Sequence, residues 1–357
     1  MTSYQILAVN PGSTSTKISV YKDEACIYKD NIHHCNKELN KFVDINSQLD
    51  FRKSLILKFL RANDIPVKQI SVVVGRGGFL KPLSSGTYIV NDKMCEDLRC
   101  PTRNHASNLG GLIAKSIADD FDIPSYVVDP VAVNETQPLG KVSGLKGFER
   151  FTLFHCLNSK AVGRKAAKHF KKRYDEINLV IAHMGGGISV SAHQNGVTID
   201  ATCGLLGEGS FSTERAGTLG QSSMLDLCFN SGKTRDELEK LLVGQGGLVS
   251  YLGTNNCLEV EKMIQRGNKE AELYYNAMAY QVAKDIAALS SVMKGKVDAI
   301  CLTGGISYSK MFIDWIIERI EFLAPVLVYP GEFEQEALTL GALRVLKGEI
   351  EAKIYKG

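Results

Sequence analysis

Two glycine-rich turns, separated by about half of the chain, limit the folds that this sequence can adopt. Residues 10–17 (NPGSTSTK) and 183–189 (HMGGGIS) each follow a strand-like apolar run. Glycine lets main-chain N–H groups approach an anion closely, while hydroxyl groups and Lys17 add donors and positive charge. Both segments are therefore predicted to bind phosphate groups.

The residues after each turn argue against a Walker-type loop, which would open a helix. Residues 18–21 (ISVY) and 188–191 (ISVS) alternate apolar and polar side chains, as strands do. Each turn is thus expected to be the tip of a β-hairpin. Because the same pattern occurs twice, the sequence predicts a duplicated fold that binds a nucleotide.

Strand patterns alternate with helical patterns along the rest of the chain. Apolar runs at 71–75, 125–128 and 297–302 predict buried strands. The third run leads into Gly304 and Gly305 before a helix expected near Ser307, which is a suitable place for a nucleotide to lie against backbone. The expected fold class is α/β, and 357 residues suggest two domains.

Composition narrows the class of partner. The net charge of +3 is small, no block of like charges occurs, and no apolar run reaches transmembrane length, so neither nucleic acid nor a membrane is expected. Nine scattered cysteines without a C-x-x-C pair, and a start without a signal-like region, predict a cytoplasmic protein with free thiols. The trio His33-His34-Cys35 lacks distant partners and is interpreted as a surface turn rather than a metal site.

Taken in order, six segments resemble the butyrate kinases, within the acetate kinase branch of the actin, hexokinase and Hsp70-like superfamily. They are residues 9–17, 154–159 (FHCLNS), 183–187, 214–217 (ERAG), 302–306 (LTGGI) and 334–338 (EQEAL). The resemblance covers nearly the whole chain. It implies two RNase H-like domains around a nucleotide cleft, the first formed by 1–150 with about 335–357 and the second, with the adenosine site, by 151–334. It also implies a homodimer or a larger homo-oligomer.

The activity that the resemblance implies is reversible, ATP-dependent phosphorylation of butyrate or another short-chain carboxylate, with Mg²⁺ as cofactor. Elementary chemistry agrees, because a carboxylate acceptor is already ionised and needs no general base. Two anions must meet instead, so the site should provide cations. The candidates are His155, His183, Arg215 and Lys17.

Three catalytic roles follow from the resemblance. The arginine that holds the transferring phosphoryl group falls on Arg215, the catalytic histidine falls on His155, and an acidic residue that positions the metal or the phosphoryl group falls on Asp129. The residues alone leave other interpretations open. Arg215 could form a surface ion pair, His155 could be a core residue, and Asp129 could start a turn before Pro130.

Metal and nucleotide sites are placed in the same way. Asn10 and Glu336 are the expected metal-binding residues, since Mg²⁺ uses few protein ligands; Glu336 would also suit the first turn of a helix without any ligand. The expected nucleotide-binding residues are Asn10, Ser13, Ser15, Lys17, His183, Gly185, Gly186, Gly187, Gly304, Gly305 and Ile306.

The preferred acid is inferred from departures from the acetate kinase pattern. Residues 156–159 (CLNS) replace the Gly-Thr-Ser and the second histidine of that branch, which favours butyrate. Arg76 is the candidate for binding the carboxylate, with a role in a turn as the alternative. A branched-chain fatty acid or acetate kinase, an actin- or Hsp70-like binding module, and a sugar kinase with Asp129 as base remain open.

Overall fold

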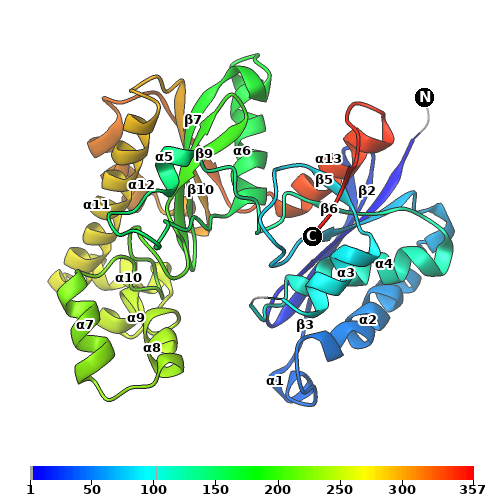
Figure 1. Cartoon of the computed structure of the whole chain (residues 1–357), viewed down its shortest axis with the longest axis horizontal. Coiled ribbons are helices and arrows are strands. Elements are labelled where there is room, and N and C mark those ends of the chain that lie inside the picture. The colour runs from blue at the N-terminus through cyan, green and yellow to red at the C-terminus, as the bar shows by residue number, and fades with distance from the viewer. Residues whose placement is uncertain (1–2, 102) are drawn as a thin grey trace. The chain divides into compact units, whose positions relative to one another are not determined.

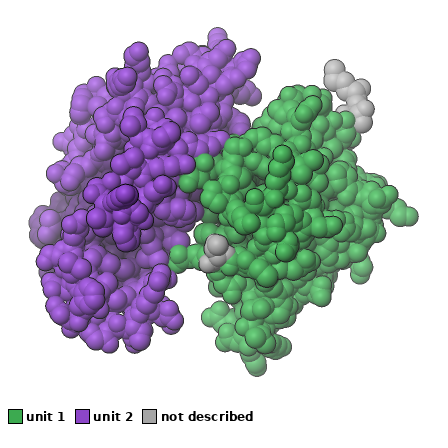
Figure 2. Space-filling model, viewed as in Figure 1, with its two compact units in different colours: residues 1–134, 333–357 green, residues 135–332 purple. Residues whose placement is uncertain are grey.

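The computed structural model describes residues 3–101 and 103–357 and divides the chain into two compact units (Figures 1 and 2). Unit 1 comprises Met1–Asn134 and Phe333–Gly357, and unit 2 comprises Glu135–Glu332. The boundaries between the two units therefore differ from the domain boundaries expected from the sequence, which were 1–150 with about 335–357 for the first domain and 151–334 for the second. That domain assignment stays a prediction.

Unit 1 is built on a seven-stranded sheet with the order β12-β5-β6-β4-β1-β2-β3. Its strands are β1 Gln5–Pro11, β2 Ser15–Lys22, β3 Ala25–His33, β4 Val72–Arg76, β5 Thr87–Ile89, β6 Ser125–Val128 and β12 Lys353–Ile354. Its helices are α1 Asn36–Leu39, α2 Leu49–Ala62, α3 Asp92–Arg99, α4 Asn108–Phe121 and α13 Glu334–Leu346, with short 3₁₀ turns at Asn46–Gln48 and Val67–Gln69.

Helices cover both faces of this sheet because its central strands are apolar on both sides. Val127 of β6 belongs to the core shared with α2 and α4. Its neighbour Val128 faces the opposite side and packs against Gly341 of α13. The last helix of the chain is thus a layer of unit 1.

Unit 2 is built on a five-stranded sheet with the order β11-β10-β7-β8-β9. Its strands are β7 Asn178–Met184, β8 Ile188–Gln194, β9 Val197–Ala201, β10 Ala299–Gly304 and β11 Val326–Pro330. Its helices are α5 Pro138–Lys141, α6 Cys156–His169, α7 Gln221–Asn230, α8 Arg235–Leu242, α9 Gly247–Leu252, α10 Cys257–Gln265, α11 Lys269–Val292 and α12 Lys310–Ile320, with 3₁₀ turns at Tyr174–Glu176 and Gly305–Tyr308.

The long helix α11 forms much of the core of unit 2. Tyr275, Met278, Val282 and Ile286 are fully buried at helical spacing and pack with β7, β8 and α12. Helix α6 packs on β7 and β10. The apolar residues of α11 thus face the sheet of unit 2.

The two sheets repeat one plan. In unit 1 the strands run β3-β2-β1-β4-β6, and in unit 2 they run β9-β8-β7-β10-β11. In both series the first three strands pair antiparallel. The fourth strand pairs parallel with the third, and the fifth pairs parallel with the fourth. The predicted α/β class, the two hairpins and the duplication are confirmed.

Three further expectations concern the thiols, the membrane and residues 33–35. All nine cysteines are free thiols, as expected. Within residues 3–101 and 103–357, no helix is long and apolar enough to cross a membrane. The interpretation of residues 33–35 as a surface turn is wrong for His34, whose side chain is 4% exposed, although His33 and Cys35 are exposed.

Candidate active site

The first glycine-rich turn connects β1 to β2 in unit 1. Gly12 N donates to Ser15 O at 2.8 Å, which closes the turn. Asn10 and Lys17 are paired across the hairpin, so their side chains leave the same face of it. Ser13 is exposed and Ser15 is partly exposed. The turn therefore presents hydroxyl groups and an ammonium group at one end of the sheet.

Asn10 belongs to a buried polar group with Arg76 and Glu334. Asn10 Nδ2 donates to Glu334 Oε2 at 2.6 Å, and Arg76 Nη1 donates to the same oxygen at 2.8 Å. Arg76 Nη1 also lies 3.4 Å from Asn10 Oδ1. The structure thus brings Arg76 to Asn10, and the carboxylate that it adds is Glu334, not the expected Glu336. Glu336 lies in the same first turn of α13, and its role as a metal ligand stays a prediction.

Sequence reasoning missed Glu334 although it stands two positions before Glu336. Both acids occupy the first turn of α13, where a carboxylate favours the helix dipole in any case. Their burial separates them, since Glu334 is 6% exposed and Glu336 is only partly buried. The helix phase relative to the sheet decides this, and a short acidic motif does not reveal that phase.

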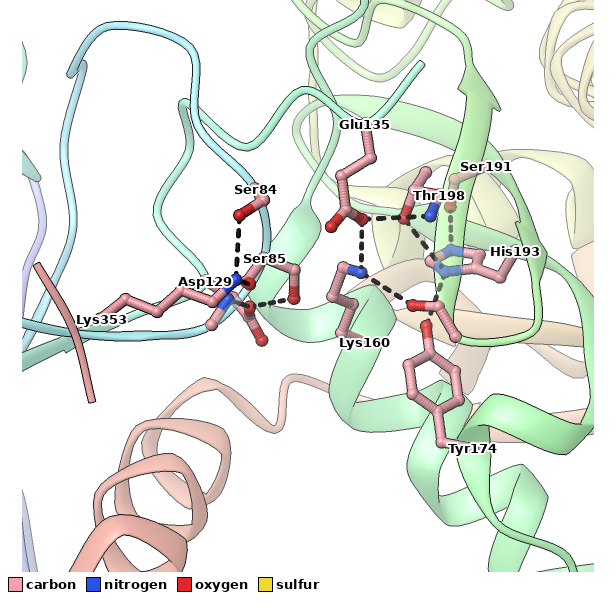
Figure 3. A network of polar contacts seen from close by, with 12 residues as sticks. Ser84, Ser85, Asp129, Glu135, Lys160, Tyr174, Ser191, His193, Thr198 and Lys353 are labelled. Carbon is pink, nitrogen blue, oxygen red and sulfur yellow. Dashed lines mark hydrogen bonds and ion pairs between the residues drawn. The ribbon is translucent and has the colours of Figure 1, made fainter. Parts of the chain in front are cut away.

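Asp129 follows β6, and its backbone has a positive φ of 40°. Its Oδ1 accepts hydrogen bonds from Ser85 Oγ at 2.5 Å and from Gly86 N at 2.9 Å (Figure 3). Asp129 therefore ties β6 to the loop before β5, which agrees with the turn role left open by the sequence. Because β1, β4 and β6 are parallel neighbours, Asn10, Arg76 and Asp129 lie at the carboxyl edge of one sheet.

In unit 2, His155 and His183 are stacked, with ring centroids 3.9 Å apart and planes inclined by 12°. His155 precedes α6, and His183 lies near the end of β7. Ser189 Oγ accepts from the backbone N of His155 at 3.2 Å and lies 2.8 Å from its Nδ1. With that hydroxyl donating to Nδ1, the Nε2 of His155 carries the ring proton and is the N–H donor.

His183 has the matching arrangement. Asn158 Nδ2 lies 2.9 Å from His183 Nδ1 and 3.3 Å from Thr303 Oγ1. An amide N–H donated to Nδ1 leaves Nε2 as the protonated nitrogen of the neutral ring. The two stacked rings can therefore both donate from Nε2. Asn158 and Ser189, which orient them, were not predicted as site residues.

The loop that carries Arg215 is bonded to the second glycine turn. Ser212 Oγ donates to Gly186 O at 2.5 Å and accepts from Arg215 N at 3.1 Å. Arg215 Nη1 donates to Gly204 O. A Cβ added at Gly187 would lie 2.1 Å from Arg215 Nη1, so the guanidinium occupies the space that a side chain at 187 would need. Unit 2 thus brings Arg215 and the predicted turn 185–187 together.

The predicted adenosine segment begins at the neighbouring strand end. Gly304 has φ of 95°, and a Cβ there would lie 2.3 Å from Met184 O, so only glycine fits. Nothing lies within 4 Å of a Cβ built on Gly305, and the residue is exposed. Ile306, in contrast, is 5% exposed and packs in the core. Gly305 is therefore the accessible member of this segment.

A separate polar network in unit 2 was not anticipated (Figure 3). Lys160, 1% exposed, donates to Glu135 Oε2 at 2.8 Å and to Gly196 O at 3.1 Å. Nearby His193 lies 2.7 Å from Tyr174 OH, and burial holds the pKa of its imidazole well below the usual value. Lysine and glutamate in the sequence gave no sign of this pairing, because 25 residues separate them.

Among known proteins, the model of the acetokinase family matches residues 143–326, just over half of the chain. The chain belongs to the acetokinase family. The expected kinship with the acetate kinase branch is thereby confirmed, while the narrower butyrate kinase assignment stays a prediction.

Solved structures of other proteins share the fold of this chain. An acetate kinase from Porphyromonas gingivalis has a TM-score of 0.78 at 17% identity, and the match covers 96% of this chain and 100% of that one. A propionate kinase from Francisella tularensis subsp. tularensis SCHU S4 has a TM-score of 0.75 at 18% identity, covering 95% and 98%. A ROK family protein from Streptococcus pneumoniae TIGR4 is more distant, with a TM-score of 0.53 at 12% identity, covering 97% of this chain and 100% of that one. The fold therefore extends to a wider group of proteins.

Proposed function

We propose that this member of the acetokinase family transfers the γ-phosphoryl group of ATP reversibly to the carboxylate of a short-chain acid, with butyrate preferred over acetate. The observation that carries the proposal is the stacked pair of His155 and His183 beside the turn that Arg215 contacts. Two N–H donors and a guanidinium are the groups that a transferring phosphoryl group needs. An ionised acceptor needs no base in addition.

The chain's own residues then have distinct tasks. His155 and Arg215 stabilise charge on the phosphoryl oxygens in the transition state, while His183 and residues 185–187 hold the nucleotide phosphates. Lys17, Ser13 and Ser15 bind phosphate oxygens from the first turn. Gly304 and Gly305 accommodate the adenosine, for which Ile306 provides packing from beneath. The fold match to an acetate kinase and a propionate kinase supports this division of labour.

Unit 1 holds two oxygen donors of the kind that Mg²⁺ takes together with phosphate and water, Asn10 Oδ1 and Glu334 Oε2. Both face Arg76 Nη1, at 3.4 and 2.8 Å, so a bound ion would displace that guanidinium from them. Glu334 is our first candidate and Glu336 the alternative. When bound, the ion would neutralise charge on the nucleotide phosphates. Arg76, which already contacts Glu334, would bind the carboxylate of the acid, and Asp129, at the carboxyl edge of the same sheet, would position the metal or the phosphoryl group.

The preference for butyrate rests on residues 156–159. Cys156 and Leu157 are buried at the start of α6, next to His155, and they replace smaller or polar residues of the acetate kinase pattern. Two additional buried methylenes are worth about 0.8 kcal/mol each. We therefore expect butyrate to exceed acetate in kcat/KM by about tenfold or more.

An acyl-hydroxamate assay with ATP and a panel of acids tests both levels of the proposal. Butyrate should be phosphorylated fastest at limiting concentration, with propionate, isobutyrate and valerate intermediate, and with glucose and glycerol unreactive. Faster reaction with acetate or with a branched acid would reassign the substrate and keep the carboxylate kinase. Hydrolysis of ATP without any acyl phosphate would indicate an actin- or Hsp70-like module, and phosphorylated glucose would indicate a sugar kinase.

We also propose that the protein is cytoplasmic and works as a homodimer or a larger homo-oligomer, as the family resemblance implies. Light scattering after size-exclusion chromatography measures the mass directly. A monomer at micromolar concentration would contradict this part of the proposal and leave the catalytic part unaffected.

A further inference from the structure

A buried arginine supports the first glycine-rich turn from within unit 1. Arg52 lies on α2 and is 1% exposed. Its Nη1 donates to Gly12 O at 2.9 Å and to Ser15 O at 3.0 Å, and its Nη2 donates to Ser13 O at 3.3 Å. Three carbonyl groups of one short turn therefore point at a single guanidinium.

The remaining donors of Arg52 are also used. Nη1 lies 3.1 Å from Thr16 Oγ1, while Nε and Nη2 donate to Gln48 Oε1 at 3.1 and 2.9 Å. Gln48 is itself buried, just before α2. The side chain is thus fixed in one orientation by hydrogen bonds at every nitrogen.

The charge of Arg52 is balanced by dipoles alone. Among the residues that the structure describes, no carboxylate forms an ion pair with it. Burial lowers the pKa of its guanidinium to about 10, so the group stays charged at neutral pH. A buried cation without a counter-ion is costly, and an anion bound on the other side of the turn would offset part of that cost.

The geometry of the turn shows where such an anion would bind. In a trans peptide, the C=O and the following N–H point in opposite directions. Because the carbonyls of Gly12 and Ser13 point at Arg52, the N–H groups of Ser13 and Thr14 point away from it. Within the described residues, neither N–H donates to another protein group, and both side chains are exposed.

We propose that Arg52 is a positioning residue of the first phosphate turn: it orients the N–H groups of Ser13 and Thr14 outward and adds positive charge behind them. The identity of the anion, a phosphoryl oxygen of ATP or of the acyl phosphate, rests on the proposed function. No residue signature in the sequence marks this role, because Arg52 is 37 to 40 residues away from the groups that it holds.

Three variants test the role. Arg52→Met removes the positive charge and the guanidinium donors and keeps a side chain of similar length. Arg52→Lys keeps the charge but not the planar set of N–H donors. Arg61→Met changes an exposed arginine of the same helix and serves as the control. We expect Arg52→Met to lower kcat/KM for ATP about a hundredfold, mostly through KM, since misplacement of a phosphate-binding group by about 1 Å has effects of that size. Arg52→Lys should recover about tenfold of this loss, and Arg61→Met should stay within about twofold.

Hydrogen exchange separates positioning from a merely structural role. Mass spectrometry should show faster amide exchange in residues 12–17 of Arg52→Met, and ATP should slow that exchange less than in the native protein. A folded Arg52→Met with native kcat/KM and native exchange would overturn the proposal.

A milder variant covers the case in which Arg52→Met does not fold. Gln48→Met removes the oxygen that accepts hydrogen bonds from Arg52 Nε and Nη2 and keeps the charge of Arg52. We expect the KM for ATP to rise about fivefold. Unchanged kinetics in both Gln48→Met and Arg52→Lys would overturn the proposal as well.

Calorimetry with ATP distinguishes this inference from the proposed function. If the native protein binds ATP, Arg52→Lys binds it more weakly, and no acid is phosphorylated, then the function fails and the role of Arg52 stands. If the native protein phosphorylates acids and the Arg52 variants bind and react as it does, then the role of Arg52 fails and the function stands.

Discussion

The two glycine-rich turns occupy equivalent places in the repeated strand order, yet they obtain their charge from opposite sides. The turn of unit 1 is supported from within by Arg52, which binds its carbonyl groups. The turn of unit 2 is flanked by side chains that lie beside the glycines themselves, His183 and Arg215. We therefore propose that the first turn holds a ground-state phosphate and that the second responds as charge develops in the transition state.

The glycines themselves record this difference. A Cβ at Gly12 would meet its nearest neighbours, Ser15 O and Ser15 Oγ, at 3.6 and 3.8 Å, which are ordinary contacts. A Cβ at Gly187 would lie within 2.6 Å of two guanidinium atoms of Arg215. A side chain would thus find space at Gly12 of the first turn, whereas the catalytic candidate Arg215 occupies the corresponding space at Gly187 of the second turn.

The largest expected effect concerns the second turn. Arg215→Ala and His155→Ala should each lower kcat by about a hundredfold or more with little change in the KM for ATP, because these groups act on the transition state. Steady-state kinetics with butyrate measures both constants. An unchanged kcat in Arg215→Ala would contradict the proposal that the second turn acts on the transition state while the first binds a ground-state phosphate.

A matched pair of substitutions compares the turns directly. Gly187→Ala should displace Arg215 and lower kcat about tenfold or more. Some stability should also be lost, because the added Cβ would lie 3.0 Å from the backbone oxygen of Gly204. Gly12→Ala should stay within about threefold, since its Cβ meets only ordinary contacts. Kinetics and thermal melts of both proteins are needed. Equal losses would show that the space in front of both turns is used in the same way.

Lys17→Ala should weaken ATP binding and turnover together, by about tenfold in kcat/KM. The reason is its place on the first turn, where it would bind ground-state phosphate oxygens. Calorimetric titration with ATP checks the binding term, and Lys22→Ala, at the exposed far end of the same strand, is the control. A loss confined to kcat would assign Lys17 to the transition state instead.

The smallest effect is a pH dependence behind the first turn. Burial, with a contribution from Arg52, lowers the pKa of His34 from 6.5 to about 4, against the opposing charge of Glu38. The unfolded chain therefore takes up a proton at higher pH than the folded one, and folding stability is lost as the pH falls from 6.5 to about 4. His34→Gln should reduce that loss by an amount on the order of 1 kcal/mol, after allowance for solvent screening. Denaturant melts at pH 7 and pH 4.5 measure the free energy of unfolding of both proteins. An equal loss of that free energy between the two pH values in both proteins would contradict the assignment.

The sequence predicts well those features that depend on local patterns. The hairpins follow from alternation, and the strand ends at Val128 and Gly304 follow from apolar runs that stop at aspartate or glycine, while β4 continues one residue beyond its expected run, to Arg76. Family membership follows from six short motifs in order. All of these signals lie within a few residues of one another.

The features that sequence reasoning missed depend on contacts between distant segments. Glu334 was missed because its contact with Asn10 depends on the phase of one helix turn. Asn158 was noted only as a departure from a pattern, and the structure makes it the partner of His183. Arg52, in an ordinary amphipathic helix, gave no sign of its buried contacts.

The places where the chain passes between the units have a common property with a mechanical consequence. The chain enters unit 2 at Glu135 and returns to unit 1 at Phe333. A glutamate stands at or next to each entry point: Glu135, which is half-buried, is bonded to Lys160, and Glu334, which is buried, is bonded to Arg76 and Asn10. Each unit therefore holds the chain segment that enters it through a contact with one of its own side chains. Since Glu334 is also our candidate metal ligand, an ion bound there would act on the first turn of α13, directly after the chain returns to unit 1.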